Sequence, residues 1–368
     1  MSQSLRILMT ADAVGGVWQY CADLIRGLSE QGAQILLATL GPRPSLQQKR
    51  QIEDIPGVEL VEGDYALEWM QTPWRDVDES GKWLLKLQSE FKADVIHLNG
   101  YGHAALPWNK PVLVTAHSCV FSWWRAVHGC SPDAEWAEYK RRVTAGLEAA
   151  TAVVAPTEFM AEGLRDEYGL FNRNVKVIHN FSAMKPNPVT QKQPFCLAAG
   201  RLWDPAKNLR LLAEIGPELD WPVRVAGSER GPDGTAVKAD SIKLLGALDH
   251  EDFLKHLQGA GIFLHPAYYE PFGLSVLEAA NFRCCLVLAD IPSLRELWDG
   301  AAVFVDPRAC DKWAIEVNRL CRDSGLRERY GMQANLRAAA YCGEKTVTEY
   351  LTTYRDLVKA KKARGVAA

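Results

Sequence analysis

The sequence predicts an α/β protein with two Rossmann-like domains, each built on a doubly wound parallel sheet. Short apolar runs alternate with amphipathic stretches along most of the 368 residues. Most of these runs lack strict polar–apolar alternation, which is typical of strands covered on both faces. A chain of this length usually divides into two domains, and repeated strand–helix units favour parallel sheets.

The first half predicts an N-terminal domain over residues 1–182. Strands are expected at residues 6–10, 34–39, 94–98, 112–115, 152–155 and 175–178. Helical patterns occupy, for example, residues 17–31 and 133–148. Ligands bind at the carboxyl ends of strands in such sheets, so the cleft between the two domains is the expected site.

A proline-rich stretch separates the halves. Residues 183–194 contain three prolines and no apolar periodicity, so we expect a linker there that acts as a hinge. The alternating pattern then restarts and predicts a C-terminal domain over residues 195–345. Its strands are expected at residues 195–199, 223–226, 242–245, 262–264, 285–288 and 302–305.

Composition excludes several classes of protein. The formal net charge of −3 gives no support for a nucleic-acid partner. No run of about 18 apolar residues occurs, so no transmembrane segment is expected. Nine scattered cysteines without a C-x-x-C pair, together with the absence of a secretory signal, favour the cytoplasm. The basic residues within 359–364 favour a solvated helix end, and a weak membrane-surface contact stays open as the alternative.

Glycines follow the first expected strand. Gly15 and Gly16 precede a helix, where glycine lets backbone N–H groups approach an anion. Neither the dinucleotide G-x-G-x-x-G pattern nor the P-loop pattern is present, which excludes a dehydrogenase reading. A tight turn alone would also require glycine, so the pair is weak by itself.

Two cations follow the first strand of the second half. Arg201 comes directly after the strand, and Lys207 stands at the expected start of a helix. Fixed positive charge beside a helix N-terminus suits a diphosphate group. Surface positions are the alternative, but the carboxyl end of a strand favours the binding site.

The sharpest motif spans residues 265–280. Glu270 is expected in a loop and Glu278 one turn into the next helix, with free N–H groups of residues 272–275 between them. Carboxylates accept hydrogen bonds from sugar hydroxyl groups. The two side chains can therefore flank one ligand. The alternative is that Glu278 is an ordinary acidic residue in the first turn of a helix.

These motifs resemble the retaining family-4 glycosyltransferases of the GT-B fold. Glu270 and Glu278, with Pro-Phe-Gly-Leu-Ser between them, resemble the family's E-x7-E signature. The segment 200–208 resembles its paired basic motif, and Gly15-Gly16 its glycine loop. The resemblance runs from Thr10 to the helices after Pro307 and implies that the last helix, residues 346–368, returns to the N-terminal domain.

The resemblance also implies roles for individual residues. Arg201 and Lys207 would neutralise the donor's diphosphate, Glu270 would hold the transferred sugar, and Glu278 would bind the ribose. The implied catalytic residues are His117, Arg201, Lys207 and Glu270. The implied donor-binding residues are Gly15, Gly16, Gly246, Leu248, Phe272, Gly273, Leu274, Ser275 and Glu278.

Acceptor contacts are expected in the N-terminal domain. Trp123 and Trp124 follow His117, and aromatic faces stack on sugar rings, whereas packing within a long loop is the alternative. Arg125 suits a carboxylate or phosphate, and Trp18 stands beside the glycine loop. The candidate acceptor-binding residues are Trp18, Asn99, Trp123, Trp124 and Arg125. His97 and His103 touch the acceptor or are buried structural histidines.

No metal or other cofactor is expected apart from a nucleotide diphosphate sugar as co-substrate. Asp76-Val-Asp78 matches a metal-binding D-x-D pattern but follows no expected strand, so we interpret it as a chance match. The predicted function is transfer of a hexose to a hydroxyl acceptor, with a soluble saccharide or small polar molecule preferred. A family-4-like sugar phosphorylase and a non-catalytic nucleotide-sugar-binding protein are the alternatives.

Overall fold

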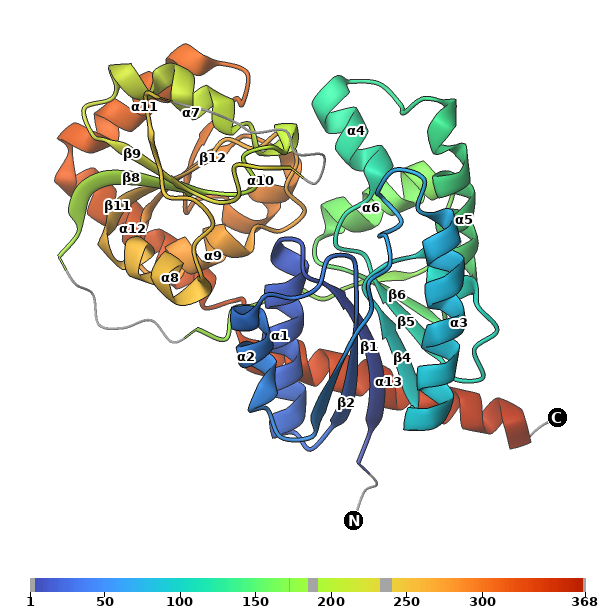
Figure 1. Cartoon of the computed structure of the whole chain (residues 1–368). Coiled ribbons are helices and arrows are strands. Elements are labelled where there is room, and N and C mark those ends of the chain that lie inside the picture. The colour runs from blue at the N-terminus through green and yellow to red at the C-terminus, as the bar shows by residue number, and fades with distance from the viewer. Residues whose placement is uncertain (1–3, 172, 185–190, 232–239, 367–368) are drawn as a thin grey trace. The chain divides into compact units, whose positions relative to one another are not determined.

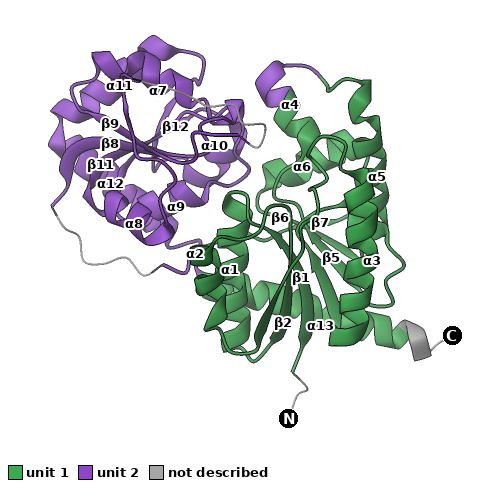
Figure 2. Ribbon diagram, in the orientation of Figure 1, with its two compact units in different colours: residues 1–124, 131–181, 343–368 green, residues 125–130, 182–342 purple. Residues whose placement is uncertain are grey.

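A computed structural model describes residues 4–171, 173–184, 191–231 and 240–366. The chain forms two compact units (Figures 1 and 2). Unit 1 contains residues 1–124, 131–181 and 343–368, and unit 2 contains residues 125–130 and 182–342. The expected linker at 183–194 lies partly outside the described residues, and strand β8 already begins at Gln193.

Unit 1 is built on a seven-stranded parallel sheet in the order β3-β2-β1-β4-β5-β6-β7. Its strands are β1 (Arg6–Asp12), β2 (Gln34–Leu40), β3 (Val58–Glu62), β4 (Val95–Leu98), β5 (Val112–Thr115), β6 (Ala152–Ala155) and β7 (Val175–Val177). Its helices are α1 (Gly16–Glu30), α2 (Leu46–Glu53), α3 (Trp74–Phe91), α4 (Val120–His128, whose last residues belong to unit 2), α5 (Ala137–Ala149), α6 (Glu158–Tyr168) and α13 (Gly343–Val366).

Unit 2 has a six-stranded parallel sheet in the order β10-β9-β8-β11-β12-β13. Its strands are β8 (Gln193–Ala199), β9 (Val223–Ala226), β10 (Lys243–Leu244), β11 (Ala260–His265), β12 (Cys285–Ala289) and β13 (Val303–Val305). Its helices are α7 (Leu209–Ile215), α8 (His250–Gly259), α9 (Leu274–Asn281), α10 (Pro292–Trp298), α11 (Cys310–Arg322) and α12 (Ser324–Ala338).

In each sheet, successive strands are added first on one side of the first strand and then on the other, so the strand order reverses once. Counting strands from the start of each unit, both orders contain the doubly wound Rossmann sequence 3-2-1-4-5-6. The reversals fall between β1 and β4 in unit 1 and between β8 and β11 in unit 2. The predicted fold class is confirmed, and the reversal in each sheet marks where a ligand crevice is expected.

All twelve expected strands are present, and one further strand, β3, was missed. β3 is a partly exposed edge strand in which Glu59 and Glu62 interrupt the apolar residues. α2 is polar and owes its start to a capping box between Ser45 and Gln48. Edge elements bury little, so their hydrophobic pattern is weak.

Buried hydrogen bonds hold helix α13 against strands β4 and β5 and helix α1 of its own unit. The hydroxyl of Tyr354 lies 2.7 Å from Nδ1 of His97 in β4, and the Tyr20 hydroxyl of α1 donates to that of Tyr350 at 2.7 Å. Tyr350 also lies 3.2 Å from the hydroxyl of Thr115 in β5. Figure 1 shows this helix in red, along the sheet of unit 1.

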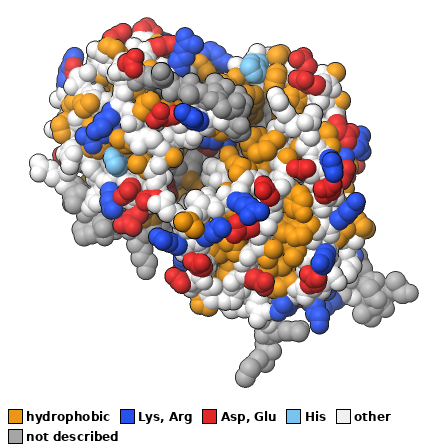
Figure 3. All heavy atoms as spheres, viewed as in Figure 1, with side chains coloured by type: hydrophobic (Ala, Val, Ile, Leu, Met, Phe, Trp, Pro, Cys, Tyr) orange, Lys and Arg blue, Asp and Glu red, His pale blue; other side chains and the backbone are white. Residues whose placement is uncertain are grey.

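Charged side chains of both signs are interspersed on the visible face of the molecule (Figure 3). This distribution accords with the formal net charge of −3. Among the helices that the structure describes, none combines the length and the apolar sequence that a membrane span requires.

Candidate donor site and active-site residues

The strongest candidate site lies at the reversal point of the unit 2 sheet. Parallel strands β8 and β11 are neighbours, and the segments that follow them leave from the same edge. Arg201 and Lys207 follow β8, whereas Glu270 follows β11. The topology therefore brings the two basic residues and the first glutamate of the E-x7-E motif to one place.

Lys207 and Glu270 form a largely buried ion pair. Lys207 Nζ lies 2.7 Å from Glu270 Oε2, and the two side chains are 16% and 12% exposed. His265 at the end of β11 donates from Nε2 to the same oxygen at 3.0 Å. Burial by itself raises the pKa of Glu270, but the charge of Lys207 and the His265 hydrogen bond outweigh it, so the pKa lies well below its usual range.

Backbone and amide contacts fix the two loops that carry this pair. Asn208, which has a φ of 51°, donates from Nδ2 to the carbonyl oxygens of Pro266 and Pro307. The amide of Tyr268 donates to the carbonyl of Ala206 at 2.8 Å. The loops after β8, β11 and β13 are thereby joined, and the ion pair is held in a defined geometry.

Arg201 is held by its own loop. Its Nη2 lies 2.6 Å from Oδ2 of Asp204, a carboxylate that also accepts from the amide of Ala206. The guanidinium lies 5.2 Å from the centre of the Trp203 ring, a cation–π contact. Within the described residues the buried Nε of Arg201 has no hydrogen-bond partner. An anion beside this nitrogen would complete its hydrogen bonding.

Helix α9 starts at the edge of this cluster. Its N-cap, Gly273, has a φ of 85°, a region that residues with a side chain rarely adopt. The first backbone amides of a helix have no intrahelical acceptor, so those of Leu274 and Ser275 can serve a ligand. Phe272 is 3% exposed and contributes its ring to the core of unit 2.

Glu278 lies inside the first turns of α9 and is 4% exposed. His250, the first residue of α8, donates from Nε2 to Glu278 Oε1 at 2.6 Å. The segment between β10 and α8 carries Gly246 and Leu248; Gly246 has a φ of 69°, and its carbonyl accepts from the amide of Gly227.

Unit 1 places its candidates at its own reversal point. Gly15, with a φ of 85°, caps α1, and both Gly15 and Gly16 are exposed after β1. Asp12 accepts from the amide of Val14 at 2.9 Å, which shapes the turn. Asn99 follows the neighbouring strand β4, and His117 follows β5. His117 Nε2 lies 2.7 Å from Asn99 Oδ1, and burial lowers the pKa of His117 to about 3.

Comparison with known families and structures identifies the family of this chain. The family model described as Glycosyltransferase Family 4 matches residues 14–181, and the one described as Glycosyl transferases group 1 matches residues 182–337. The sucrose-phosphate synthase structure from Thermosynechococcus elongatus aligns with a TM-score of 0.79 at 16% identity, covering 97% of this chain and 100% of the other. The chain is a family-4 glycosyltransferase of the GT-B fold.

Curated relatives of this glycosyltransferase are themselves named as sugar transferases. The D-inositol 3-phosphate glycosyltransferase of Corynebacterium diphtheriae is 25% identical over 93% of this chain and 90% of that protein. The O-antigen chain mannosyltransferase B of Escherichia coli is 25% identical over 46% of this chain and 49% of that protein, so the match spans about half of each. A structure of Anabaena HepE in complex with UDP and glucose aligns with a TM-score of 0.70 at 14% identity, covering 96% of this chain and 100% of the other.

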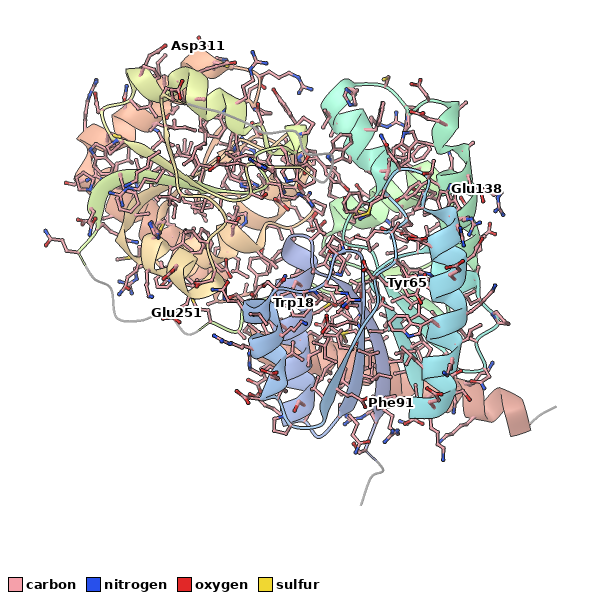
Figure 4. All side chains as sticks on the ribbon, in the orientation of Figure 1. Trp18, Tyr65, Phe91, Glu138, Glu251 and Asp311 are labelled. Atoms are coloured by element: carbon pink, nitrogen blue, oxygen red, sulfur yellow. The ribbon has the colours of Figure 1, made fainter. Side chains whose placement is uncertain are left out.

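The aromatic acceptor candidates of the glycosyltransferase are engaged with protein neighbours. Trp18, labelled in Figure 4, is 3% exposed and donates from Nε1 to Gln51 of α2 at 2.6 Å. Trp123 and Trp124 lie on helix α4, not in the long loop considered as the alternative. Trp124 contacts Trp136 with a centroid distance of 6.2 Å, and Arg125 is exposed. A role for these residues in acceptor binding stays a prediction.

Two histidines in unit 1 that were left open are structural. His97 is fully buried between Thr115 and Tyr354 of the glycosyltransferase, and burial lowers its pKa to about 3. His103 is 8% exposed and contacts the hydroxyl of Ser80 and the carbonyl of Val77.

The carboxylates of the D-x-D pattern lie on α3 and have protein partners elsewhere in unit 1. Asp76 accepts from the amide of Ala66 at 2.8 Å, and Asp78 pairs with Arg142. Within the described part of the chain, no group of three or more possible metal ligands is found.

Sequence reasoning missed the partners of these candidate site residues. His250 and His265 each donate to one glutamate of the E-x7-E motif, and Asp204 orients Arg201. The position of His265 at a strand end was a usable signal. The pairing of His250 with Glu278 depends on the packing of α8 against α9 and leaves no local pattern.

Proposed function

We propose that this glycosyltransferase is a retaining, metal-independent enzyme that moves a hexose from a nucleoside diphosphate sugar to a hydroxyl acceptor. The Lys207–Glu270 pair carries the proposal, because it holds a cation 2.7 Å from the carboxylate expected at the sugar, and Arg201 follows the same strand β8 as Lys207. Fixed positive charge can stabilise the diphosphate as the glycosidic bond breaks, which is the task a metal ion performs elsewhere.

The donor would contact unit 2 from phosphate to base. Arg201 and Lys207 would bind the diphosphate, and Glu278 would accept from the ribose hydroxyls through Oε2, since His250 already occupies Oε1. Glu270 and the amides of residues 272–275 would hold hydroxyls of the transferred sugar. Residues 246–248 would lie beside the base. Gly15 and Gly16 of unit 1 would approach the phosphate or the sugar through their backbone.

Retention of configuration is proposed without a covalent intermediate. Glu270 Oε2 is committed to Lys207 and His265, and a carboxylate of low pKa that accepts two hydrogen bonds is a weak nucleophile. We favour attack by the acceptor oxygen on the face that the diphosphate leaves. The bond from the anomeric carbon to phosphate breaks, the bond to the acceptor oxygen forms, and the acceptor's proton passes to the departing phosphate.

The acceptor class is proposed as a soluble saccharide or a small polar molecule. The names of the Corynebacterium and Thermosynechococcus proteins contain inositol 3-phosphate and sucrose phosphate, both small and polar. The Escherichia coli relative is named for an O-antigen chain, so oligosaccharides belong in the same screen. The nine cysteines all lie within the described residues and form no disulfide, which supports a reducing cytoplasm as the compartment.

A thermal-shift panel in EDTA tests the proposal. UDP, GDP, ADP and TDP are compared, with UDP first because the Anabaena structure contains it. We expect one nucleotide to raise the melting temperature without added metal, and its hexose conjugates then enter an acceptor screen with anomer-resolved NMR of the product. A stabilising nucleotide that requires Mg²⁺ or Mn²⁺ contradicts metal independence, and an inverted product contradicts retention.

A further inference from the structure

The amide of Asn99 has only one orientation that satisfies its surroundings. Its Nδ2 donates to the carbonyl of Thr10 at 2.6 Å and to Cys21 Sγ at 3.3 Å. Its backbone amide donates to the Thr10 hydroxyl at 3.0 Å. A flipped amide would set Oδ1 against the Thr10 carbonyl, so Oδ1 is the atom that faces His117.

This orientation decides which nitrogen of His117 carries the proton. Asn99 Oδ1 only accepts hydrogen bonds, so His117 Nε2, 2.7 Å away, is the donor. Burial keeps the ring neutral, with a pKa of about 3. A neutral imidazole has one proton, which leaves Nδ1 as an acceptor. Among the described residues, no hydrogen-bond partner for Nδ1 is found.

A second contact fixes the plane of the imidazole. The ring of Tyr20 packs edge-on against His117 with a centroid distance of 4.4 Å and an interplanar angle of 66°. The Tyr20 hydroxyl is itself anchored to Tyr350 of α13 at 2.7 Å. Rotation of the His117 ring therefore requires displacement of a fully packed side chain.

We infer that Asn99 and Tyr20 are positioning residues that hold His117 with its proton on Nε2, so that Nδ1 is offered as a hydrogen-bond acceptor to a substrate hydroxyl group. The inference rests on the proposed function, because it assumes that His117 faces the sugar or the acceptor. In this arrangement Asn99 acts through His117, and direct binding of the acceptor by Asn99 stays a separate prediction.

The same geometry excludes His117 as an effective general base. In a catalytic triad a carboxylate stabilises the imidazolium that forms when histidine takes a proton. Asn99 offers a neutral amide oxygen instead, and a group with a pKa of about 3 is a weak base at neutral pH. His117 thus orients a hydroxyl group, and the proton of the acceptor leaves by another route.

The Asn99→Asp variant tests this assignment through its pH profile. A carboxylate at this position should raise the pKa of His117, so that Nδ1 becomes protonated and stops accepting. We expect kcat/KM of the variant to fall about tenfold per pH unit below the raised pKa, whereas His117 gives the wild type no such limb between pH 6 and 8. A variant that is faster than the wild type at every pH would establish a base and overturn the inference. A flat profile would also overturn it in a variant whose introduced carboxylate is shown by NMR to be ionised, because a protonated carboxyl group could donate to the Thr10 carbonyl and leave the pKa of His117 unchanged.

The charged and titratable groups around His117 do not produce that limb themselves. They are Asp12 at the end of β1, Tyr20 and Cys21 of α1, His97 of β4, and Tyr350 and Tyr354 of α13. Burial raises the pKa of the three tyrosines and of Cys21 and lowers that of His97 to about 3. The three tyrosines, Cys21 and His97 therefore keep their charge between pH 6 and 8, and Asp12 is common to the variant and the wild type.

NMR of protein labelled with ¹⁵N-histidine gives a readout that is independent of activity. The wild type should show His117 protonated at Nε2 alone, and Asn99→Ala should show both tautomers with about tenfold lower kcat/KM, the effect of one hydrogen bond. Tyr20→Phe keeps the ring beside His117, so His117 should stay protonated at Nε2 and most activity should remain. Tyr20→Ala removes the ring, so both tautomers of His117 should appear and activity should fall. Mixed tautomers in the wild type would overturn this inference, whereas absence of sugar transfer by the wild type would count against the proposed function.

Discussion

Lys207 and Glu270 stand 63 residues apart in the sequence, yet Nζ and Oε2 lie 2.7 Å apart. The pair joins the loops that follow β8 and β11, the two strands between which the sheet order of unit 2 reverses. One carboxylate oxygen receives both the ammonium group and His265 Nε2. The geometry thus couples the cation expected at the leaving diphosphate to the carboxylate expected at the sugar.

The first prediction concerns Lys207. Lys207→Met should lower kcat/KM about 10²- to 10³-fold, because a fixed charge opposite the leaving group is removed. It should also lower the free energy of unfolding by roughly 1–3 kcal/mol, because Glu270 loses its main partner. Adding Glu270→Gln should restore part of the stability but no activity. Arg210→Met is the control: its side chain is 89% exposed and, among the described residues, pairs only with Glu214 on the same helix, so both quantities should stay unchanged. Loss of stability without loss of activity per folded molecule would limit Lys207 to a structural role.

The second prediction compares two glycines of unit 2 with positive φ. Gly273→Ala and Gly300→Ala place a side chain at φ of 85° and 75°, so each should cost roughly 1–2 kcal/mol of stability. A Cβ at Gly273 would also lie 3.2 Å from Val276 Cγ2 and 3.3 Å from Glu270 Cγ, whereas one at Gly300 meets nothing within 4 Å. Only the Gly273 variant should therefore weaken binding of the nucleotide sugar, as measured by calorimetry. Equal affinity in both variants would separate the α9 N-terminus from the donor site.

Much of the fold follows from the sequence because the central strands are buried on both faces. Ile7, Leu8 and Met9 of β1 are fully buried, and such a run of apolar residues predicts a strand without knowledge of its neighbours in the sheet. The edge strand β3 was missed because Glu59 and Glu62 break its apolar pattern.

The site was predictable only in part. Positions at strand ends predict Arg201, Lys207 and Glu270, since the topology collects the carboxyl ends of parallel strands. Orientation was not predictable: that His250 donates to Glu278, or that Asn99 faces His117, depends on side-chain packing across 28 and 18 residues of sequence.

The third prediction concerns His250. Because Glu278 is 4% exposed, removing its histidine donor should leave the carboxylate poorly oriented for the ribose. His250→Ala should weaken binding of the stabilising nucleoside diphosphate about tenfold, the effect of one charged hydrogen bond. His256→Ala is the matched control on the same helix, since its Nδ1 contacts the carbonyl of Asp252 within α8. If both variants bind the nucleotide as the wild type does, Glu278 needs no partner for its role.

The fourth prediction is a loss of stability in mild acid, caused by two buried histidines of unit 1. Burial lowers the pKa of both His97 and His117 to about 3, whereas the unfolded chain has the ordinary value of about 6.5. Between these values the unfolded state binds more protons, so the free energy of unfolding falls as the pH falls. The slope is about 1.4 kcal/mol per pH unit for each histidine, or roughly 2 kcal/mol each at pH 5.

Urea unfolding between pH 5 and 8 measures that slope. His97→Gln removes one titrating group while keeping a donor and an acceptor between Thr115 and Tyr354, so the slope should decrease by about 1.4 kcal/mol per pH unit. A His97→Gln slope equal to that of the wild type would mean that His97 takes up a proton in the folded chain. A charged imidazolium would then lie between the hydroxyl groups of Thr115 and Tyr354. Each hydroxyl oxygen can accept a hydrogen bond from one of its two N–H groups.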